Sequence, residues 1–463
     1  MGFALSVIYF VTYYLTPAAV FGPLAALHIQ IIIAALLIIV SVPTLLKSFT
    51  LKMPQSLALL GLAIAVFLSV LIGMRWPGGA VQAFLNFVPN AFAFFIVCIH
   101  CNTIKKLKVL AAAMLFVCLF VIAHGAFDLL RGLPESPNTQ EDASESSLKT
   151  ASPYFLRQLS DNNVWIYRLE GLGEINDPND FAQVIVSVIP FMFLFWRPRN
   201  LLWNILVVLL PLCAFLFGAY LTHSRGSLVA LMAVIVVAAR RRIGTVPSLV
   251  LAAGIFIAAS ALQFTGGRDI SASAGSGRTG LWGESMQVLV THPLFGVGYG
   301  NLVNYTDDNL TAHNSVVVCA AELGLFGLYF WSLFLYSTIS DALAIASPAN
   351  VTEAEPIVPE DAPFPQTAFK IEEVDKAEIN RVGSLMVLSL TGYLVTGLFL
   401  SRAFILTPFL LGGMAEAAFL IALKRGMVPP RMPLARLLKF TGGLTISLVV
   451  MMYILIRALN LMH

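Results

Sequence analysis

The chain has 463 residues, of which 58% are hydrophobic and only 11% are charged, and its mean hydropathy is +0.84. Soluble domains average about 45–50% apolar and about 25% charged residues, so one water-exposed core cannot bury this excess. The composition therefore excludes a soluble protein. The net charge of +3 gives a nucleic-acid partner no electrostatic support.

Apolar stretches long enough to cross a bilayer, which takes about 20 residues in a helix, recur along the whole chain. We count thirteen, several of them short or closely coupled, and expect an all-α polytopic integral membrane protein with about 12–13 transmembrane helices. The first stretch has no basic start and no small-residue cleavage site, so we interpret it as a retained span and not as a signal peptide. The expected spans are residues 4–22, 27–46, 55–74, 80–100, 107–124, 181–196, 201–220, 227–239, 246–264, 314–340, 382–400, 404–423 and 441–459.

Two long outer loops and one long inner loop interrupt these spans. The inner loop is acidic and proline-rich (AEPIVPEDAPFP) and is interpreted as a disordered tether. The outer loops carry the dense motifs, and we expect short interfacial helices in them. The predicted organisation is N-terminal spans at 1–124, a first outer loop at 125–180, central spans at 181–264, a second outer loop with the catalytic motifs at 265–313, a span at 314–340, the acidic cytoplasmic loop at 341–380 and C-terminal spans at 381–463.

The orientation follows from the basic residues. With the N-terminus in the cytoplasm, 18 of the 28 lysines and arginines fall on the cytoplasmic side, as the positive-inside rule requires. Half of these are lysines, whereas the outer set contains nine arginines and a single lysine, Lys149. Arginine grips carboxylate and phosphate groups in a two-pronged geometry that lysine lacks, so the outer face is predicted to bind an anion.

The five cysteines predict neither a disulfide framework nor a metal site. All of them lie inside or at the edge of apolar stretches. Cys98 and Cys101 are spaced like metal ligands, but no second pair follows at a suitable distance. We therefore expect no bound metal and no cofactor.

The first outer motif, GLGEINDPND at 171–180, precedes the sixth span. Asp177-Pro178 followed by Asn179-Asp180 is typical of a turn that leads into a helix cap, which is the purely structural interpretation. The functional interpretation is a polar shelf formed by Asp177, Asn179 and Asp180 for sugar hydroxyls. A Mg²⁺ site beside a pyrophosphate is a weaker alternative, because nothing else in the sequence supports a metal.

The second motif, Thr222-His-Ser-Arg225-Gly-Ser227, lies between two spans, at the membrane boundary. Arg225 opens a helix, where exposed backbone N–H groups and a guanidinium together form an anion site. The alternative is an interfacial arginine whose side chain reaches lipid headgroups. His223 is a minor candidate.

The third motif lies in the second outer loop. Arg278 follows a flexible Ser/Gly run and precedes an amphipathic segment with Trp282, which we expect to lie along the membrane interface. The glycine loop GVGYG at 296–300 follows. It is neither a nucleotide-binding fingerprint nor a potassium filter, because the surroundings that each requires are missing.

The fourth motif, Ala312-His313-Asn314-Ser315, opens the tenth span. Asn314 or Ser315 caps the helix, and the helix dipole keeps His313 neutral, as a general base requires; the alternative is a structural cap. Glu322 lies roughly 13 Å further along the helix, too far for direct contact, and an intramembrane carboxylate is usually paired or functional. Arg402 is another outer arginine and a candidate partner or ligand.

Taken in order, these segments resemble the O-antigen ligase and O-antigen polymerase superfamily of bacterial membrane proteins. Each segment alone is weakly specific, whereas the ordered set, which covers residues 171–404, is strong. The matching pieces are GEINDPNDFAQ at 173–183, THSRGSLVAL at 222–231, GRTGLW at 277–282, HPLFGVGYGN at 292–301, AHNSVVVCAAELGLFG at 312–327 and FLSRAF at 399–404. The resemblance implies a GT-C-like, lipid-dependent glycosyltransferase of the bacterial inner membrane. Its donor would be a glycan on undecaprenyl pyrophosphate, used on the periplasmic face.

With this donor, we expect a single inverting displacement at the anomeric carbon. His313 would accept the proton of the acceptor hydroxyl. Arg225, Arg278 and Arg402 would neutralise the charge on the departing pyrophosphate, as a metal ion does in other enzymes. The residues expected to position sugar or guanidinium groups are Asp177, Asn179, Asp180, Asn314 and Glu322.

The acceptor stays open at this stage. Ligases of the superfamily use lipid A–core, polymerases extend another lipid-linked glycan, and some relatives glycosylate proteins; we rank the ligase first and the polymerase second. A lipid-linked oligosaccharide flippase or anion transporter is the alternative from another class. Such a protein places charges in broken helices at mid-membrane and often has internal repeats, whereas here the arginines and His313 gather at one boundary and no repeat is found.

Overall fold

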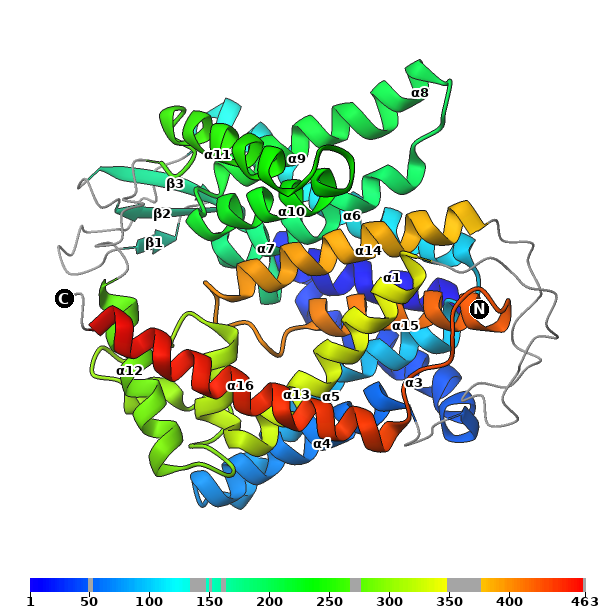
Figure 1. The fold of residues 1–463 in the computed structure, drawn as a ribbon. Helices are drawn as coiled ribbons and strands as arrows, with labels where there is room; N and C mark the ends of the chain where they lie inside the picture. The colour runs from blue at the N-terminus through cyan, green and yellow to red at the C-terminus, as the bar shows by residue number, and fades with distance from the viewer. Residues whose placement is uncertain are drawn as a thin grey trace. The chain divides into compact units, whose positions relative to one another are not determined.

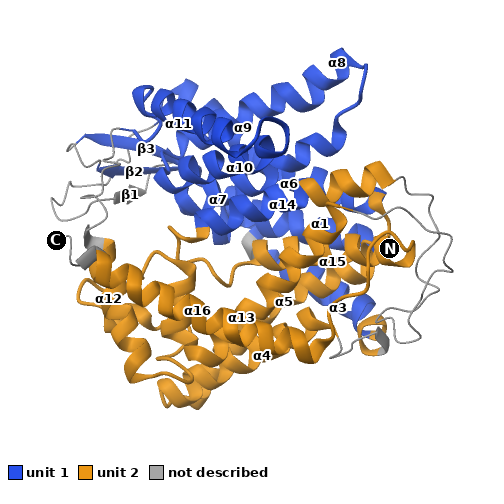
Figure 2. Ribbon diagram, viewed as in Figure 1, with its two compact units in different colours: residues 1–42, 105–270, 385–396 blue, residues 43–104, 271–384, 397–463 orange. Residues whose placement is uncertain are grey.

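The long apolar stretches form helices, because a helix satisfies its backbone polar groups internally where no water is available. Figure 1 shows them in the computed structural model of the chain. The chain divides into two compact units, which Figure 2 shows in different colours. The structure describes residues 1–48, 53–133, 147–149, 152–159, 164–266, 276–347 and 376–460.

Unit 1 comprises Met1–Val42, Lys105–Ile270 and Leu385–Thr396. It therefore contains two of the four outer motifs. Its helices are α1 (Gly2–Leu15), α2 (Pro17–Val20), η1 (Gly22–Leu27), most of α3 (Ile29–Ser48), α6 (Ile104–Arg131), η3 (Gly173–Ile175), α7 (Pro178–Val188), η4 (Ile189–Phe195), α8 (Leu201–Asn204), η5 (Ile205–Leu209), α9 (Leu210–Leu221), α10 (Arg225–Ile243), α11 (Thr245–Ala261) and the C-terminal half of α14 (Lys376–Gly397).

The first outer loop contains a small antiparallel sheet that the sequence analysis did not predict. Its strands are β1 (Ser147–Lys149), β2 (Phe155–Leu159) and β3 (Trp165–Leu169), in the order β1-β2-β3. Leu156 of β2 pairs with Arg168 of β3. The run Trp-Ile-Tyr in β3 is typical of strands. The sheet is the one exception to the expected helical architecture among the described residues.

Unit 2 comprises Pro43–Ile104, Ser271–Ser384 and Gly397–His463. Its central helix is α13, which packs against α4, α12, α15 and α16. Phe334 of α13 contacts Phe94 and Phe409, with ring centroids 5.9 and 5.4 Å away. Its helices are α4 (Pro54–Leu68), η2 (Ser69–Gly73), α5 (Pro77–His100), α12 (Ser276–Thr291), η7 (Leu302–Tyr305), α13 (Ser315–Ile345), α15 (Leu406–Lys424) and α16 (Leu434–Asn460).

Ten helices of the described chain are long and apolar enough to cross a membrane. They correspond to ten of the thirteen expected spans. The other three expected ranges, 227–239, 246–264 and 382–400, are also helical, as α10, α11 and α14; α11 is apolar but only 17 residues long. The prediction of an all-α, multi-pass membrane protein is confirmed.

The central helix α13 is broken near its N-terminal end. Gly324 has φ 66° and ψ −169°, a conformation that only glycine adopts readily. The glycine loop that follows α12 fills the break. Val297 and Gly298 donate backbone hydrogen bonds to the carbonyls of Ala321 and Glu322, each at 3.1 Å. Beyond the break, the N–H groups of Leu325 and Phe326 donate to the carbonyls of Pro293 and Leu294, at 2.8 and 3.2 Å.

The far end of α13 carries a buried charge cluster. Arg431 binds both carboxylate oxygens of Asp341, at 2.9 and 2.8 Å, and also bonds to Glu416 of α15. Gln55 of α4 donates to the same Asp341 at 2.6 Å. Burial alone would lower the pKa of Arg431, but the carboxylates of Asp341 and Glu416 raise that pKa above its ordinary value. The cluster ties α4, α13 and α15 to the segment before α16.

The acidic inner loop is shorter than predicted at both of its ends. α13 continues to Ile345 and α14 begins at Lys376, so these residues of the expected 341–380 loop are helical. The rest of the expected loop, residues 348–375, lies outside the described residues.

Candidate functional site

In unit 1, the Thr222–Ser227 segment forms a sharp turn from α9 into α10. Thr222 ends α9, and His223 adopts a left-handed conformation with φ 48°. Ser224 then caps α10, because its hydroxyl accepts a hydrogen bond from the N–H of Ser227 at 3.4 Å. Arg225 is the first residue of α10, as the sequence predicted. Its side chain is half-buried.

A buried arginine that the sequence analysis did not select holds this turn. Arg168 of β3 is 2% exposed. Its Nε donates to the carbonyl oxygen of Thr222 at 2.8 Å, its Nη1 to Gln158 Oε1 at 2.6 Å and its Nη2 to Asn179 Oδ1 at 2.8 Å. Arg168 therefore joins two motifs that lie 43 residues apart in the chain, those of Asn179 and Thr222.

The Asp177 segment caps a helix, as the structural interpretation predicted. The Asp177 carboxylate accepts from the N–H groups of Asn179 and Asp180, at 2.7 and 3.3 Å, at the start of α7. Asn179 accepts from Arg168, and Asp180 is 2% exposed. The contacts of Asp177 and Asn179 are thus contacts within the protein, and a role in sugar binding for these three residues stays a prediction.

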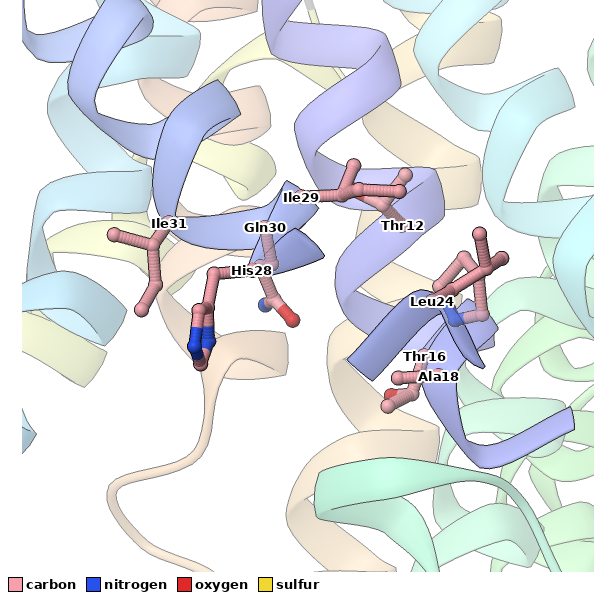
Figure 3. Close-up of a pocket in the computed structure, with 9 residues that line it drawn as sticks. Thr12, Thr16, Ala18, Leu24, His28, Ile29, Gln30 and Ile31 are labelled. Carbon is pink, nitrogen blue, oxygen red and sulfur yellow. The ribbon is translucent and has the colours of Figure 1, made fainter. Parts of the chain in front are cut away.

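A pocket of about 260 Å³ lies beside this segment in unit 1 (Figure 3). Thr12 and Thr16 line it from α1, and His28 and Gln30 line it from the start of α3. A Cβ atom at Gly173 would collide with the hydroxyl of Thr16, so η3 lies directly against this end of α1. The sequence analysis did not predict this pocket.

In unit 2, His313 lies directly before the N-terminus of α13. Its φ is 47°, and its backbone N–H donates to the hydroxyl of Ser401 at 2.9 Å. Asn314 caps α13, because its side-chain oxygen accepts from Val316 and Val317 at 3.0 and 3.3 Å. The expectation that Asn314 or Ser315 caps the helix is therefore met by Asn314.

Two further bonds fix the surroundings of His313. Ser315 donates to the carbonyl of Leu400 at 2.7 Å, so the segment that carries Arg402 lies against the start of α13. Trp282 of α12 donates its indole N–H to the carbonyl of Ala312 at 2.7 Å. Arg278 lies four residues before Trp282, on the same face of α12 and one turn away. The helix that carries Arg278 is thus bonded to Ala312, directly before His313. The segment that carries Arg402 is bonded to His313 itself and to Ser315.

The three side chains remain accessible in part. Arg278, His313 and Arg402 are all half-buried, whereas their neighbours Ala312, Asn314 and Ala403 are buried. Partly desolvated cations bind phosphate oxygens more strongly than fully hydrated ones, because screening by water is weaker. This part of unit 2 is able to bind an anion beside an imidazole.

Glu322 braces the glycine loop. It is 4% exposed, and its carboxylate accepts from the backbone N–H of Gly300 at 3.0 Å and also from Leu302. Tyr299, in the same loop, donates its backbone N–H to Ser69 at 3.1 Å, and its ring lies 5.5 Å from that of Phe404. The structure therefore gives Glu322 a partner on the protein, as expected of an intramembrane carboxylate.

Ser401 and Arg168 are the residues that the sequence analysis missed. Ser401 lies inside the FLSRAF run, where the neighbouring arginine drew attention. Arg168 is the one charged residue of the run Trp-Ile-Tyr-Arg-Leu, whose aromatic and β-branched residues are typical of a strand. Among the described residues, no group of three or more His, Cys, Asp or Glu side chains is placed to hold a metal ion.

Residues 211–332 match the profile of a protein family described as O-antigen ligase. This match supports the resemblance of the chain to the O-antigen ligase and O-antigen polymerase superfamily. The matching range runs from α9 into α13 and contains Arg225, Arg278, His313 and Glu322. The match supports a membrane glycosyltransferase of the ligase or polymerase type, which acts on lipid-linked glycans. No curated protein matches the chain.

Proposed function

We propose that this protein transfers a glycan from undecaprenyl pyrophosphate to an acceptor hydroxyl at the periplasmic face of the bacterial inner membrane. The first-ranked acceptor is lipid A–core, which makes the protein an O-antigen ligase of lipopolysaccharide assembly. A polymerase that extends a second lipid-linked glycan is the alternative within the superfamily. The family supports both, and the site residues below are compatible with both.

The arrangement around His313 is the observation that carries this proposal. One imidazole lies at a helix start, where the dipole favours its neutral form, and the hydrogen bonds of Ala312, His313 and Ser315 hold the Arg278 helix and the Arg402 segment against it. Arginines on segments that are bonded to the residues around a base suit a glycosyl transfer from a pyrophosphate.

The proposed step is a single inverting displacement. His313 accepts the proton of the acceptor hydroxyl while the acceptor oxygen forms a bond to the anomeric carbon. The bond from that carbon to the phosphate oxygen breaks, and undecaprenyl pyrophosphate leaves with the electron pair. Arg278 and Arg402 stabilise the negative charge on this leaving group through charge-assisted hydrogen bonds. For Arg225, at the start of α10 in unit 1, we also propose a role in pyrophosphate binding.

The break in α13 does not favour the transporter alternative. A transporter uses the unpaired backbone groups of a broken helix to bind its substrate. Here the carbonyls of Ala321 and Glu322 bond to the glycine loop, and the N–H groups of Leu325 and Phe326 bond to the two residues Pro293 and Leu294 shortly before it. The break therefore supports a fixed scaffold for surface chemistry better than a transport path.

A transfer assay with and without the acceptor tests the proposal. The purified protein in nanodiscs receives the undecaprenyl pyrophosphate-linked glycan fraction of cells that lack this protein, with lipid A–core in one reaction and none in the other. Glycan on lipid A–core is the expected product. A longer lipid-linked glycan without lipid A–core would support the polymerase. Absence of product in both reactions, together with activity in a lipid-flipping assay, would overturn the proposal that this protein is a glycosyltransferase.

A further inference from the structure

Arg168 is a buried charge of unit 1 whose donors are engaged on several sides. Three of its donors bind three acceptors on three elements: Gln158 in β2, Asn179 in the first turn of α7 and the carbonyl of Thr222 at the end of α9. A buried guanidinium destabilises a fold unless its donors are satisfied. The three bonds of Arg168 satisfy this requirement at the point where the two motifs of unit 1 meet.

The bond to Thr222 acts directly on the turn that presents Arg225. Thr222 ends α9, and helix C-terminal carbonyls carry partial negative charge, so a cation there is favourable. His223, the next residue, has φ 48°, a left-handed conformation that is strained in a residue with a Cβ atom. A strained turn persists only where its surroundings fix it.

Two contacts hold this strained residue from opposite ends. Arg168 binds the carbonyl before His223, and the His223 ring lies 3.1 Å, Nδ1 to O, from the carbonyl of Phe264. The cap of Ser224 follows, and Arg225 begins α10. Arg168 bonds to a residue three positions before Arg225. By fixing the backbone there, it helps to fix the backbone position of Arg225 at the start of α10.

We propose that Arg168 is a positioning residue for anion binding by Arg225. It fixes the Thr222–Arg225 turn against Asn179 and the sheet, so that Arg225 is held ready before the substrate arrives. The proposal rests on the proposed function for the identity of the anion, the pyrophosphate of the donor. The geometric part, control of the turn by Arg168, does not depend on any activity.

The geometric part is tested first, by hydrogen–deuterium exchange of the purified protein in nanodiscs. Arg168→Lys keeps the positive charge but cannot donate along three fixed directions. We expect the amides of 222–228 to exchange at least tenfold faster in this variant, because the turn opens more often. Arg157→Lys is the matched control: Arg157 lies on the adjacent strand, and its guanidinium carbon lies 4.8 Å from the centroid of the Trp165 ring. Unchanged exchange at 222–228 in Arg168→Lys, or equal acceleration in the control, would overturn the positioning role.

The functional part is tested by a double-mutant cycle on the binding of undecaprenyl pyrophosphate alone. Loss of one charge-assisted contact is expected to weaken binding roughly tenfold in Arg168→Lys and in Arg225→Gln. Because Arg168 acts through Arg225, the double variant should bind within about twofold of Arg225→Gln alone. If the double variant instead lost binding by the product of the two single losses, Arg168 would not act through Arg225, and the positioning role would be contradicted.

The two failures can be distinguished. If wild type does not bind undecaprenyl pyrophosphate while the exchange result holds, the proposed function fails and the turn-fixing role stands. If wild type binds and the cycle is additive, the proposed function stands and the positioning role fails. Thermal unfolding of all variants, measured in the same nanodiscs, excludes global destabilisation as the source of a binding loss.

Discussion

At the residue scale, two histidines share one local conformation. His223 and His313 both have φ near 48°, and each is followed by an extended residue, Ser224 or Asn314, whose side chain caps the next helix. Each also receives an outside contact, from Phe264 or from Ser401. A left-handed residue before a cap turns the chain sharply, so the imidazole is placed beside the positive helix end. This conformation is stored strain of roughly 1–3 kcal/mol that the surrounding bonds maintain.

Arg278→Gln and Arg402→Gln are each expected to lower the transfer rate by about 10²- to 10³-fold, the effect of removing one group that stabilises a developing negative charge. The double variant should be slower than either single variant, because both guanidinium groups face the same leaving group in the proposed mechanism. Initial rates of glycan transfer measure this. Arg436→Gln, an exposed arginine at the start of α16, is the control and should leave the rate unchanged. A double variant no slower than the singles would contradict a shared anion.

Glu322→Ala removes the acceptor of the Gly300 N–H, a hydrogen bond to a charged group that is worth about 1.5–3 kcal/mol. We expect a lower midpoint of thermal unfolding and a small loss in Glu322→Gln, whose side-chain carbonyl still accepts. Glu284→Ala is the control, because Glu284 also accepts a backbone N–H, from Asp307, but at the surface. If Glu322→Ala were as stable as wild type, the hydrogen bond from Gly300 to Glu322 would not stabilise the fold. Direct contact of Glu322 with a sugar would then be favoured.

At the element scale, α13 combines a functional start with a structural end. His313 and the cap of Asn314 stand before its first residue, the glycine loop fills the break at Gly324, and Asp341 belongs to the buried Arg431 cluster near its last turn. The loop replaces the helical hydrogen bonds that the break removes, which keeps every one of these backbone groups paired. The first turns of α13 are therefore held rigidly by the loop, by α12 and by the Arg402 segment.

Gly324→Ala tests this interpretation of the break. A Cβ atom there would collide with the backbone of Leu294, and φ 66° with ψ −169° costs other residues about 1–3 kcal/mol even without the collision. We expect a marked loss of thermal stability together with a loss of transfer. Gly254→Ala in α11 has no atom within 4 Å of the added carbon and should be neutral or slightly stabilising. Equal behaviour of the two variants in thermal unfolding would contradict the account of the break.

At the scale of the whole molecule, the helical architecture was predicted well from the sequence, whereas the contacts between distant residues were not. Every expected span is helical, because composition and length alone require it in a bilayer. The sheet was missed because its short strands lie in a polar loop between strong helix patterns. The partners of Thr222, Glu322 and His313 were missed because they lie 54, 22 and 88 residues away in the chain. Local patterns identified caps and helix starts correctly, whereas pairing across long sequence separations is not visible in one sequence.

The charge distribution of the molecule leads to a prediction about metal ions. Nine of the ten predicted outer basic residues are arginines, and the proposed mechanism assigns charge neutralisation to three of them. We expect the transfer rate of wild type to be unchanged by EDTA and not to rise on addition of Mg²⁺. Raising the salt concentration should slow transfer instead, because salt screens the partly exposed guanidinium groups. A rate that falls with EDTA and recovers with Mg²⁺ would contradict this assignment.

The most direct test of the central claim is the single-turnover rate of glycan transfer by His313→Asn. Asparagine tolerates the left-handed conformation of position 313, so the backbone and its bond to Ser401 are retained while the base is removed. We predict a rate about 10²- to 10⁴-fold below wild type with donor binding preserved, the usual loss when a general base is removed. His124→Asn, at an exposed histidine outside the site, should match wild type. Transfer by His313→Asn at the wild-type rate would contradict the proposed base and, with it, the account of the site.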